Sequence, residues 1–217
     1  MKNFFMVSFW VFVFILSGGK IFVFPGYAEP ERYDFPAFRL KLTTPSPRLA
    51  PSTPAGEDAL RKQNEARRKS IASLLRRYNR KLGEEKAYEY AILIIQVSEK
   101  FRQNPFVIAA MVVNESSARH DVVSRGGDYG LMQVRWRVHQ KKIKKQHPSV
   151  TKAKDILDPK INLLVGTEIF SVYRETANED TREALMYYTA GNKQHADKVF
   201  AVLAQLEKSY QELLDNS

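Results

Sequence analysis

The feature that most constrains this sequence is an almost wholly apolar segment, residues 105–113, which ends beside a charged group. Asn104 is placed to cap a helix and Pro105 suits its first turn, so the segment is predicted to form a buried helix. That helix carries Glu115 at its C-terminal end, where the helix dipole is negative and apolar neighbours are close. Both effects disfavour a charged carboxylate, and a carboxylic acid that keeps its proton is what general acid catalysis requires.

Position alone allows two interpretations of Glu115. Most glutamates at helix ends simply reach solvent. A catalytic acid is favoured by the residues downstream: Ser116 comes next, and the run Gly130-Leu131-Met132-Gln133 comes some dozen residues later. Residues 158–167 and 184–192 then add two further motifs, Asp-Pro-Lys-Ile-Asn-Leu-Leu-Val-Gly-Thr and Ala-Leu-Met-Tyr-Tyr-Thr-Ala-Gly-Asn.

These four motifs, in this order, resemble the lysozyme-like lytic transglycosylases of the soluble lytic transglycosylase type. The resemblance covers roughly residues 85–206. It implies an all-α, lysozyme-like helical domain that cleaves the β-1,4 bond between N-acetylmuramic acid (MurNAc) and N-acetylglucosamine (GlcNAc) in peptidoglycan. The expected product is a glycan strand that ends in 1,6-anhydro-MurNAc, and no cofactor is expected.

The resemblance also assigns roles to individual residues. It makes Glu115 the single catalytic acid and base. The expected substrate-binding residues are Ser116, Gly130, Leu131, Met132, Gln133 and Tyr188. Gly130 would let the backbone approach the sugar, because it has no Cβ. For Met132, a surface facing a sugar ring and ordinary packing in the core are equally good interpretations. One of Tyr187 and Tyr188 is expected in the core and the other in the cleft.

Two positions depart from the family pattern. Thr189 stands where the family usually has asparagine, so a hydroxyl replaces an amide in the expected cleft. Asp128 stands where the family more often has a small residue, and animal-type lysozymes have their second catalytic carboxylate in a similar Asp-Tyr-Gly context. Asp128 is therefore a possible second carboxylate of a retaining hydrolase. The favoured alternative is a turn residue that hydrogen-bonds to its own backbone.

The N-terminal part of the chain is predicted to be a targeting segment followed by a spacer. Residues 1–28 contain one early lysine, an apolar run and small residues before the end, which is typical of a cleaved signal peptide. An uncleaved anchor in the inner membrane is the alternative. Residues 29–56 are rich in proline, serine and threonine and are predicted to form an extended linker. The protein is therefore expected in the periplasm or cell envelope.

The rest of the chain is predicted to be helical. Residues 57–82 form a basic helix that packs on the domain and ends at Gly83, and residues 83–217 form the catalytic domain. Further helices are expected over residues 84–101, 158–177 and 196–214, with another opened by Asp180 and stopped by Gly191. No strand pattern of useful length is evident.

Charge and composition limit the classes of partner and cofactor that the protein is expected to bind. The net charge of +10 suits an anionic, insoluble substrate such as the cell wall, and export excludes nucleic acid. The chain has no cysteine, and its histidines lack metal-ligand spacing: His139 and His147 fit no pattern, while His120 and His195 are isolated. No metal site is predicted.

The main functional prediction is therefore a monomeric lytic transglycosylase that acts on peptidoglycan glycan strands. Two alternatives stay open. One is a lysozyme-type muramidase that uses Asp128 as a second carboxylate. The other is a non-catalytic wall-binding component of a secretion apparatus or a similar cell-wall machine.

Overall fold

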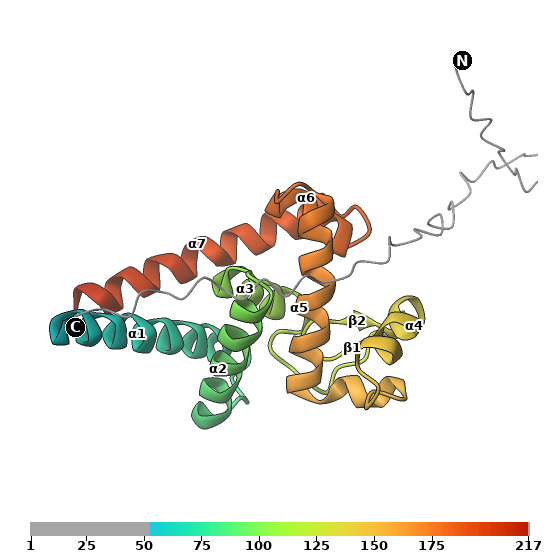
Figure 1. Ribbon diagram of the computed structural model, residues 1–217, viewed down its shortest axis with the longest axis horizontal. Helices are drawn as coiled ribbons and strands as arrows, with labels where there is room; N and C mark the ends of the chain where they lie inside the picture. Colours follow the sequence, from blue (N-terminus) through green and yellow to red (C-terminus); the bar gives the residue numbers. More distant parts are fainter. Residues whose placement is uncertain (1–52, 217) are drawn as a thin grey trace, which may run out of the picture. The chain divides into compact units, whose positions relative to one another are not determined.

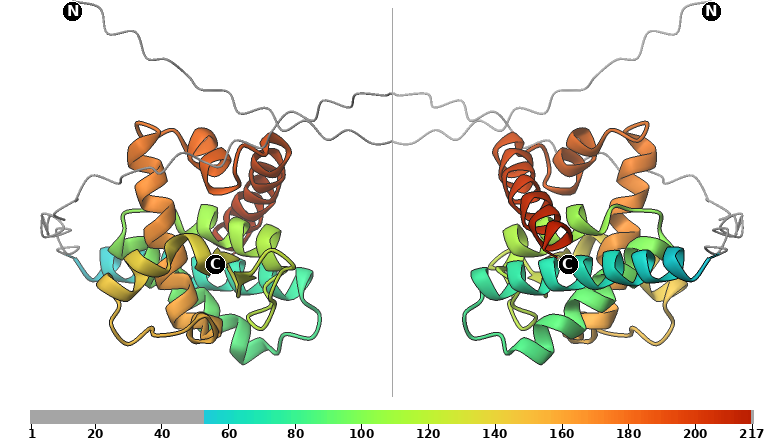
Figure 2. Two further views of the ribbon diagram at one scale, coloured as in Figure 1. Left: turned by 90° about the vertical axis from the view of Figure 1, so that its right-hand side faces the viewer. Right: turned by 90° about the vertical axis from the view of Figure 1, so that its left-hand side faces the viewer.

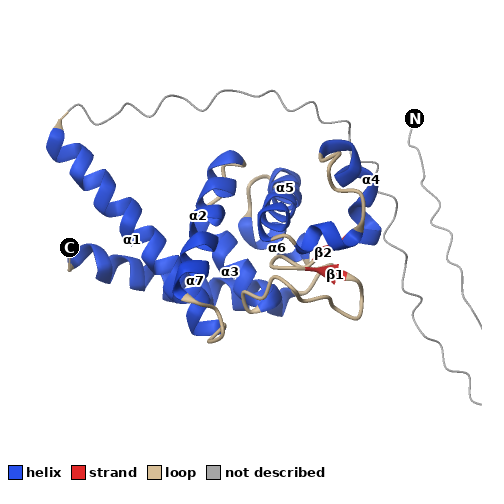
Figure 3. Ribbon diagram, turned by 90° about the horizontal axis from the view of Figure 1, so that it is seen from below, coloured by secondary structure: helices blue, strands red, loops and turns tan. Residues whose placement is uncertain are grey.

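The computed structural model describes residues 53–216. Within this range nearly all of the regular secondary structure is helical, as the all-α prediction required (Figure 3). The elements are α1 (Pro54–Tyr78), α2 (Glu84–Lys100), α3 (Pro105–Ser116), β1 (Asp128–Tyr129), β2 (Val134–Arg135), α4 (Trp136–Gln146), the 3-10 helix η1 (Ala153–Leu157), α5 (Pro159–Thr176), α6 (Thr181–Tyr188) and α7 (Lys193–Asp215). The predicted signal segment and nearly all of the predicted linker lie outside the described residues.

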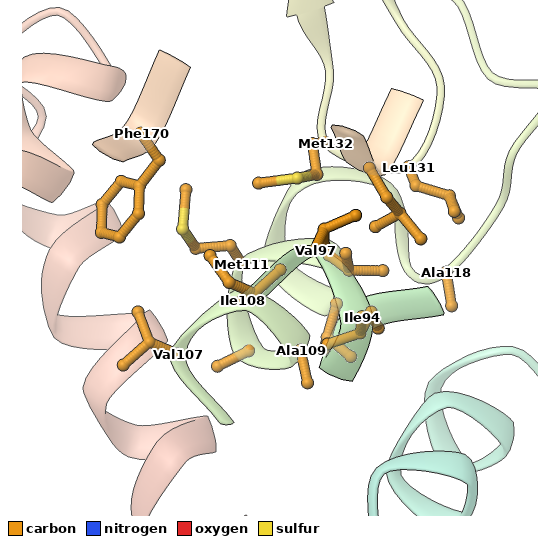
Figure 4. Packing of buried hydrophobic residues seen from close by; sticks show 14 of the residues in the cluster. Ile94, Val97, Val107, Ile108, Ala109, Met111, Ala118, Leu131, Met132 and Phe170 are labelled. Atoms are coloured by element: carbon orange, nitrogen blue, oxygen red, sulfur yellow. The ribbon is translucent and has the colours of Figure 1, made fainter. Parts of the chain in front are cut away.

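Helix α3 lies in the hydrophobic core, as predicted from its sequence. Its residues from Phe106 to Val113 are all buried, and the Asn104 side chain caps it by accepting a hydrogen bond from Phe106 N at 2.9 Å. Figure 4 shows side chains of α3, Ile108 and Met111 among them, together with side chains from α2, from α5 and from the segment after β1. Because each large aliphatic side chain stabilises the fold by about 1.5–3 kcal/mol when buried, α3 is held firmly and its C-terminal end has a defined position.

Helix α1 corrects two predictions. It begins at Pro54, three residues before the predicted start, because the Thr53 hydroxyl accepts a hydrogen bond from Gly56 N and Pro54 suits the first turn. It ends at Tyr78, and Gly83 is the N-terminal flanking residue of α2 rather than the end of α1. The buried face of α1 packs against α2 and α7 (Figure 1). Its basic side chains lie mostly on the opposite face of the helix, which is exposed to solvent.

The other predicted helices are present with bounds within a few residues of those expected. Asp158 caps α5, and Asp180 caps α6 by accepting from Glu183 N at 2.8 Å. Figure 2 shows α6 between one end of α5 and the N-terminal end of α7. Between α3 and α5 the chain forms the short antiparallel pair β1–β2, then α4 and η1. Sequence patterns did not predict α4 as a separate helix, nor the β1–β2 pair.

None of the helices within residues 53–216 combines the length and the apolar character that a membrane crossing requires.

Candidate active site

Glu115 lies in the last turn of α3, where the chain leaves the helix through the left-handed conformation of Ser117. Its side chain keeps only 14% of its surface exposed. The buried carboxylate oxygen is Oε1, and it makes no aligned hydrogen bond within the described part of the chain. The apolar helix thus delivers one carboxyl group, almost enclosed, at a fixed point.

A second titratable side chain, that of His195 in the first turn of α7, lies beside the carboxyl group of Glu115. Asn192 begins α7 by accepting a hydrogen bond from His195 N at 3.1 Å, which fixes the histidine backbone. His195 Nε2 lies 3.1 Å from Glu115 Oε1, although the two atoms are not aligned as a hydrogen bond. The sequence interpretation of His195 concerned only metal-ligand spacing and did not predict this pairing with Glu115. The two residues are 80 positions apart in the chain, and only the packing of α7 on α3 brings them together.

The segment after β1 lies against α5 and is held there by a buried amide, the side chain of Asn162. Asn162 Nδ2 donates to Tyr129 O at 2.7 Å and to Ile156 O at 3.0 Å, and Oδ1 accepts from Met132 N at 2.7 Å. Both Nδ2 and Oδ1 of Asn162 are therefore hydrogen-bonded, as a buried polar group requires. Asn162 was not predicted as a site residue, although a lone amide among apolar neighbours in α5 is the signal that could have identified it.

Two predicted site residues tie the same segment to other helices. The buried Ser116 hydroxyl donates to Leu131 O at 2.9 Å, and Val112 O is a second acceptor at 3.2 Å. The Tyr188 hydroxyl donates to Met132 O at 2.8 Å. Burial, and then the negative charge of Glu115, raise the pKa of Tyr188 well above its ordinary value, so its hydroxyl stays protonated. These contacts link α3, α6 and the segment after β1 around the acid.

Leu131 and Met132 do not expose their side chains. Both are fully buried, so core packing, and not a surface offered to a sugar ring, is the correct interpretation of Met132. The Met132 sulfur lies 3.6 Å from Thr167 Oγ1, and a Cβ on Gly166 would come within 2.7 Å of Met132 Cβ. Any contribution of these two residues to substrate binding comes from their backbone.

Gly130 is required by the protein's own packing. It has a positive φ of 73°, and a Cβ at this position would lie 2.3 Å from Asn162 Nδ2. The close approach that the sequence suggested is therefore with Asn162 in this structure. The Gln133 amide is also engaged internally, since its Nε2 donates to Gly130 O at 2.8 Å.

Asp128 is held in the β1–β2 pair by both of its oxygens. Arg135 donates from Nε to Oδ1 at 2.6 Å and from Nη2 to Oδ2 at 3.0 Å, and the Ser124 hydroxyl donates to Oδ2 at 2.8 Å. Burial opposes ionisation, but the hydrogen bonds and charge of Arg135, with the Ser124 hydrogen bond, outweigh it and lower the pKa of Asp128 below its ordinary value. The turn interpretation predicted hydrogen bonds from Asp128 to its own backbone, whereas the carboxylate binds the side chains of Arg135 and Ser124 instead.

Comparison with known families identifies the domain in which this geometry occurs. The family described as transglycosylase SLT domain matches residues 92–210, more than half of the chain. The chain belongs to the SLT transglycosylase family. The predicted resemblance is therefore confirmed, and the observed helices confirm the prediction of an all-α domain.

Among solved structures, an inactive mutant of the lytic transglycosylase Slt from Pseudomonas aeruginosa is similar, with 16% sequence identity and a TM-score of 0.44. The similarity covers 56% of this chain and 22% of that protein, so this chain spans about a fifth of that relative's length. A search of curated proteins found no match.

Thr189, one of the two positions expected to depart from the family pattern, has its hydroxyl satisfied locally. Its hydroxyl donates back to Leu185 O at 2.8 Å, at the end of α6. Of the two tyrosines before it, Tyr187 is 40% exposed, whereas the half-buried Tyr188 packs its ring against Phe170 and Tyr173. Tyr188 is therefore the core-side member of the pair, and its hydroxyl still reaches the segment beside Glu115.

Two other histidines of the SLT domain lie in buried or paired surroundings. Burial lowers the pKa of His139 to about 4, and His147 Nε2 lies 2.7 Å from the buried Glu168 Oε2. No group of three or more potential metal ligands occurs within residues 53–216. An open depression of about 830 Å³ lies where α1 meets the C-terminal end of α7, and no predicted site residue lines it.

Proposed function

We propose that this SLT domain is a peptidoglycan lytic transglycosylase that cleaves the MurNAc-β-1,4-GlcNAc bond and leaves 1,6-anhydro-MurNAc ends. The observation that carries the proposal is the state of Glu115. An apolar helix places one almost enclosed carboxyl group at its end, and one oxygen of that group, Oε1, is buried 3.1 Å from His195 Nε2. We assign the other oxygen, Oε2, to the substrate. Family membership supplies the substrate class, since the matched family is named for transglycosylase activity.

In the proposed reaction Glu115 donates its proton to the glycosidic oxygen, and the bond between that oxygen and C1 of MurNAc breaks. The acetamido oxygen of the substrate stabilises the positive charge at C1, so no second protein carboxylate is needed. Glu115, now ionised, removes the proton from the MurNAc 6-hydroxyl while O6 bonds to C1. The acid regains its proton, no water is consumed, and the 1,6-anhydro ring closes.

The surroundings of Glu115 suit a single-acid mechanism. Asp128 uses both carboxylate oxygens in contacts with Arg135 and Ser124, which supports a structural role in the β1–β2 pair and disfavours a nucleophile. A lysozyme-type muramidase would need Asp128 free to approach C1. The basic charge of the chain suits a wall polymer, and we propose that the protein acts as a monomer in the periplasm or cell envelope after export.

Mass spectrometry of the fragments released from purified peptidoglycan tests the proposal. We expect fragments with 1,6-anhydro ends, each lighter by one water than the corresponding hydrolysis product. Reducing ends in their place would make the protein a hydrolase, and Asp128 would then be the first residue to replace. Strong binding to the wall without fragment release would favour the non-catalytic wall-binding component.

Replacing the acid gives the first mutational prediction. Glu115→Gln removes the transferable proton and keeps the size of the side chain, so fragment release should fall by about a hundredfold or more. Thermal unfolding should change little, and binding to purified walls should persist. Glu85→Gln, at an exposed position in the first turn of α2, is the matched control and should stay fully active. A folded Glu115→Gln protein with normal turnover would contradict the proposed function.

A further inference from the structure

His195, a titratable neighbour of Glu115, has no role in the proposed mechanism. The two side chains keep 15% (His195) and 14% (Glu115) of their surfaces exposed, and Nε2 and Oε1 are 3.1 Å apart. Within residues 53–216, neither atom makes an aligned hydrogen bond to any other group. A titratable group is thus enclosed together with the acid, at ion-pair distance.

Other charged and titratable groups lie on the elements packed around this pair, and most are occupied elsewhere. The Tyr188 hydroxyl on α6 donates to Met132 O. The others are Tyr173 on α5, the Asp128–Arg135 pair of the two strands, the Arg182–Asp197 pair that joins α6 to α7, and Arg119, whose Nε donates to Ser116 O. Among the described residues, His195 is the basic side chain within ion-pair distance of Glu115.

We propose that His195 is a positioning residue for the catalytic acid: it holds Oε1, leaves Oε2 for the glycosidic bond, and through its own protonation makes turnover less dependent on pH. The inference rests on the proposed function, because it assigns the regulation of the same site. His195 does not touch the sugar in this scheme and acts through Glu115.

The positioning part follows from the two oxygens of the carboxyl group. Oε1 is buried, so a substrate oxygen cannot reach it without displacing the imidazole. The contact with His195 restricts rotation of the carboxyl group, and Oε2 keeps one direction of approach. A well-oriented acid is more effective than a mobile one, because orientation is then established before the reaction begins.

The pH dependence follows from charge. Imidazole is ordinarily protonated below about pH 6.5, and a positive charge at this distance favours the carboxylate form of its neighbour. A carboxylate cannot donate a proton, so protonated His195 reduces the fraction of Glu115 that is able to act at acidic pH. As the pH rises from about 5 to 7, the wild-type rate should therefore fall less steeply than the rate of an enzyme whose catalytic acid has no histidine neighbour.

Two substitutions separate positioning from charge. His195→Gln retains an amide nitrogen near the position of Nε2 and cannot become charged. At saturating soluble peptidoglycan fragments, we expect wild-type kcat at pH 8 and a kcat about tenfold above wild type at pH 5. His195→Leu removes both properties, and its kcat at pH 8 should fall by about tenfold to a hundredfold with KM unchanged.

The control is His120→Gln, at an exposed histidine, which should follow the wild-type profile at every pH. A ratio of His195→Gln to wild-type kcat that is the same at pH 5 and pH 8 would overturn the charge effect. A wild-type kcat for folded His195→Leu would overturn positioning. If the Leu variant does not fold, the Gln variant still decides the pH effect.

A measurement without turnover separates this inference from the proposed function. The ring signals of the four histidines can be followed by NMR against pH in the wild type and in Glu115→Gln. Loss of the carboxylate should make His195 titrate at a lower pH, with the other three unchanged. This result would support the pairing even if no wall fragments were released. An unchanged His195 titration would overturn the inference whatever the enzyme assays show.

Discussion

Two polar clusters hold the chain between α3 and α5, and they differ mainly in how far they lie from water. Asn162 is fully buried and makes three hydrogen bonds to the backbone around Gly130. Asp128 and Arg135 also make several hydrogen bonds, but their side chains keep 16% and 49% of their surfaces exposed. The number of contacts is similar in the two clusters, whereas their surroundings are not.

The difference teaches where the stability of the active-site region originates. When a partner is lost from a buried cluster, backbone groups are left without water or protein to bond, and each costs about 1–3 kcal/mol. When a partner is lost from an exposed pair, water replaces it, and the measured worth of such pairs is about 0–1 kcal/mol. We therefore expect the Asn162 cluster to determine the geometry beside Glu115, and the Asp128–Arg135 pair to refine it.

The largest effect is expected from Asn162→Ala. It leaves Met132 N, Tyr129 O and Ile156 O without their partner in the core, so the free energy of unfolding should fall by about 4 kcal/mol. Urea denaturation followed by circular dichroism measures this loss. Asn114→Ala, which removes one hydrogen bond from a half-buried side chain to Ala110 O, is the control and should cost about 1 kcal/mol or less. Equal losses in the two variants would remove the contrast between the clusters.

Glycine substitutions test the packing of Gly130 against Asn162. Gly130 and Gly127 both have positive φ, but a Cβ on Gly130 would meet the Asn162 amide, whereas one on Gly127 meets nothing within 4 Å. Gly130→Ala should lower the free energy of unfolding by about 3 kcal/mol, from backbone strain and overpacking together. Gly127→Ala carries the strain alone and should cost about 1 kcal/mol. Thermal unfolding compares the pair directly, and similar values would mean that Asn162 yields easily.

The smallest effect is expected from Arg135→Ala. The pKa of Asp128 is lower in the folded protein than its ordinary value near 3.9, so the pair stabilises the fold above that value and loses this contribution as pH falls through the folded pKa. At pH 7 the variant should lose about 1 kcal/mol or less, because Arg135 is half exposed. Near pH 2 the two proteins should differ less. A difference in unfolding free energy that is constant from pH 2 to pH 7 would show that the charges do not cause it.

Local rules in the sequence predicted much of the fold. Asn104, Asp158 and Asp180 were recognised as helix caps, and each makes the expected side-chain hydrogen bond. These predictions succeed because a cap and the turn that it closes are neighbours in the chain. The start of α1 was missed for a related reason: a proline-rich composition obscured the Thr53-Pro54 start signal.

The predictions of site residues follow the same rule: those that rest on local sequence patterns succeeded, and those that depend on packing did not. Glu115 was predicted from an apolar helix, a property of consecutive residues, and four ordered motifs predicted the SLT family. The burial of Met132 could not be predicted, because a methionine suits a core and an exposed surface equally well. Only the packing of α5, with Gly166 against the methionine, decides between them.

The sequence by itself thus determined the family, the all-α class, the helix caps and the residue proposed as the acid, because each depends on short local patterns or on their order along the chain. The tertiary structure alone decided that His195 lies against Glu115, that Asn162 holds the segment beside the acid, and that Met132 is core. The physical reason is distance along the chain. Contacts between residues tens of positions apart depend on how whole helices pack, and no local pattern encodes that packing.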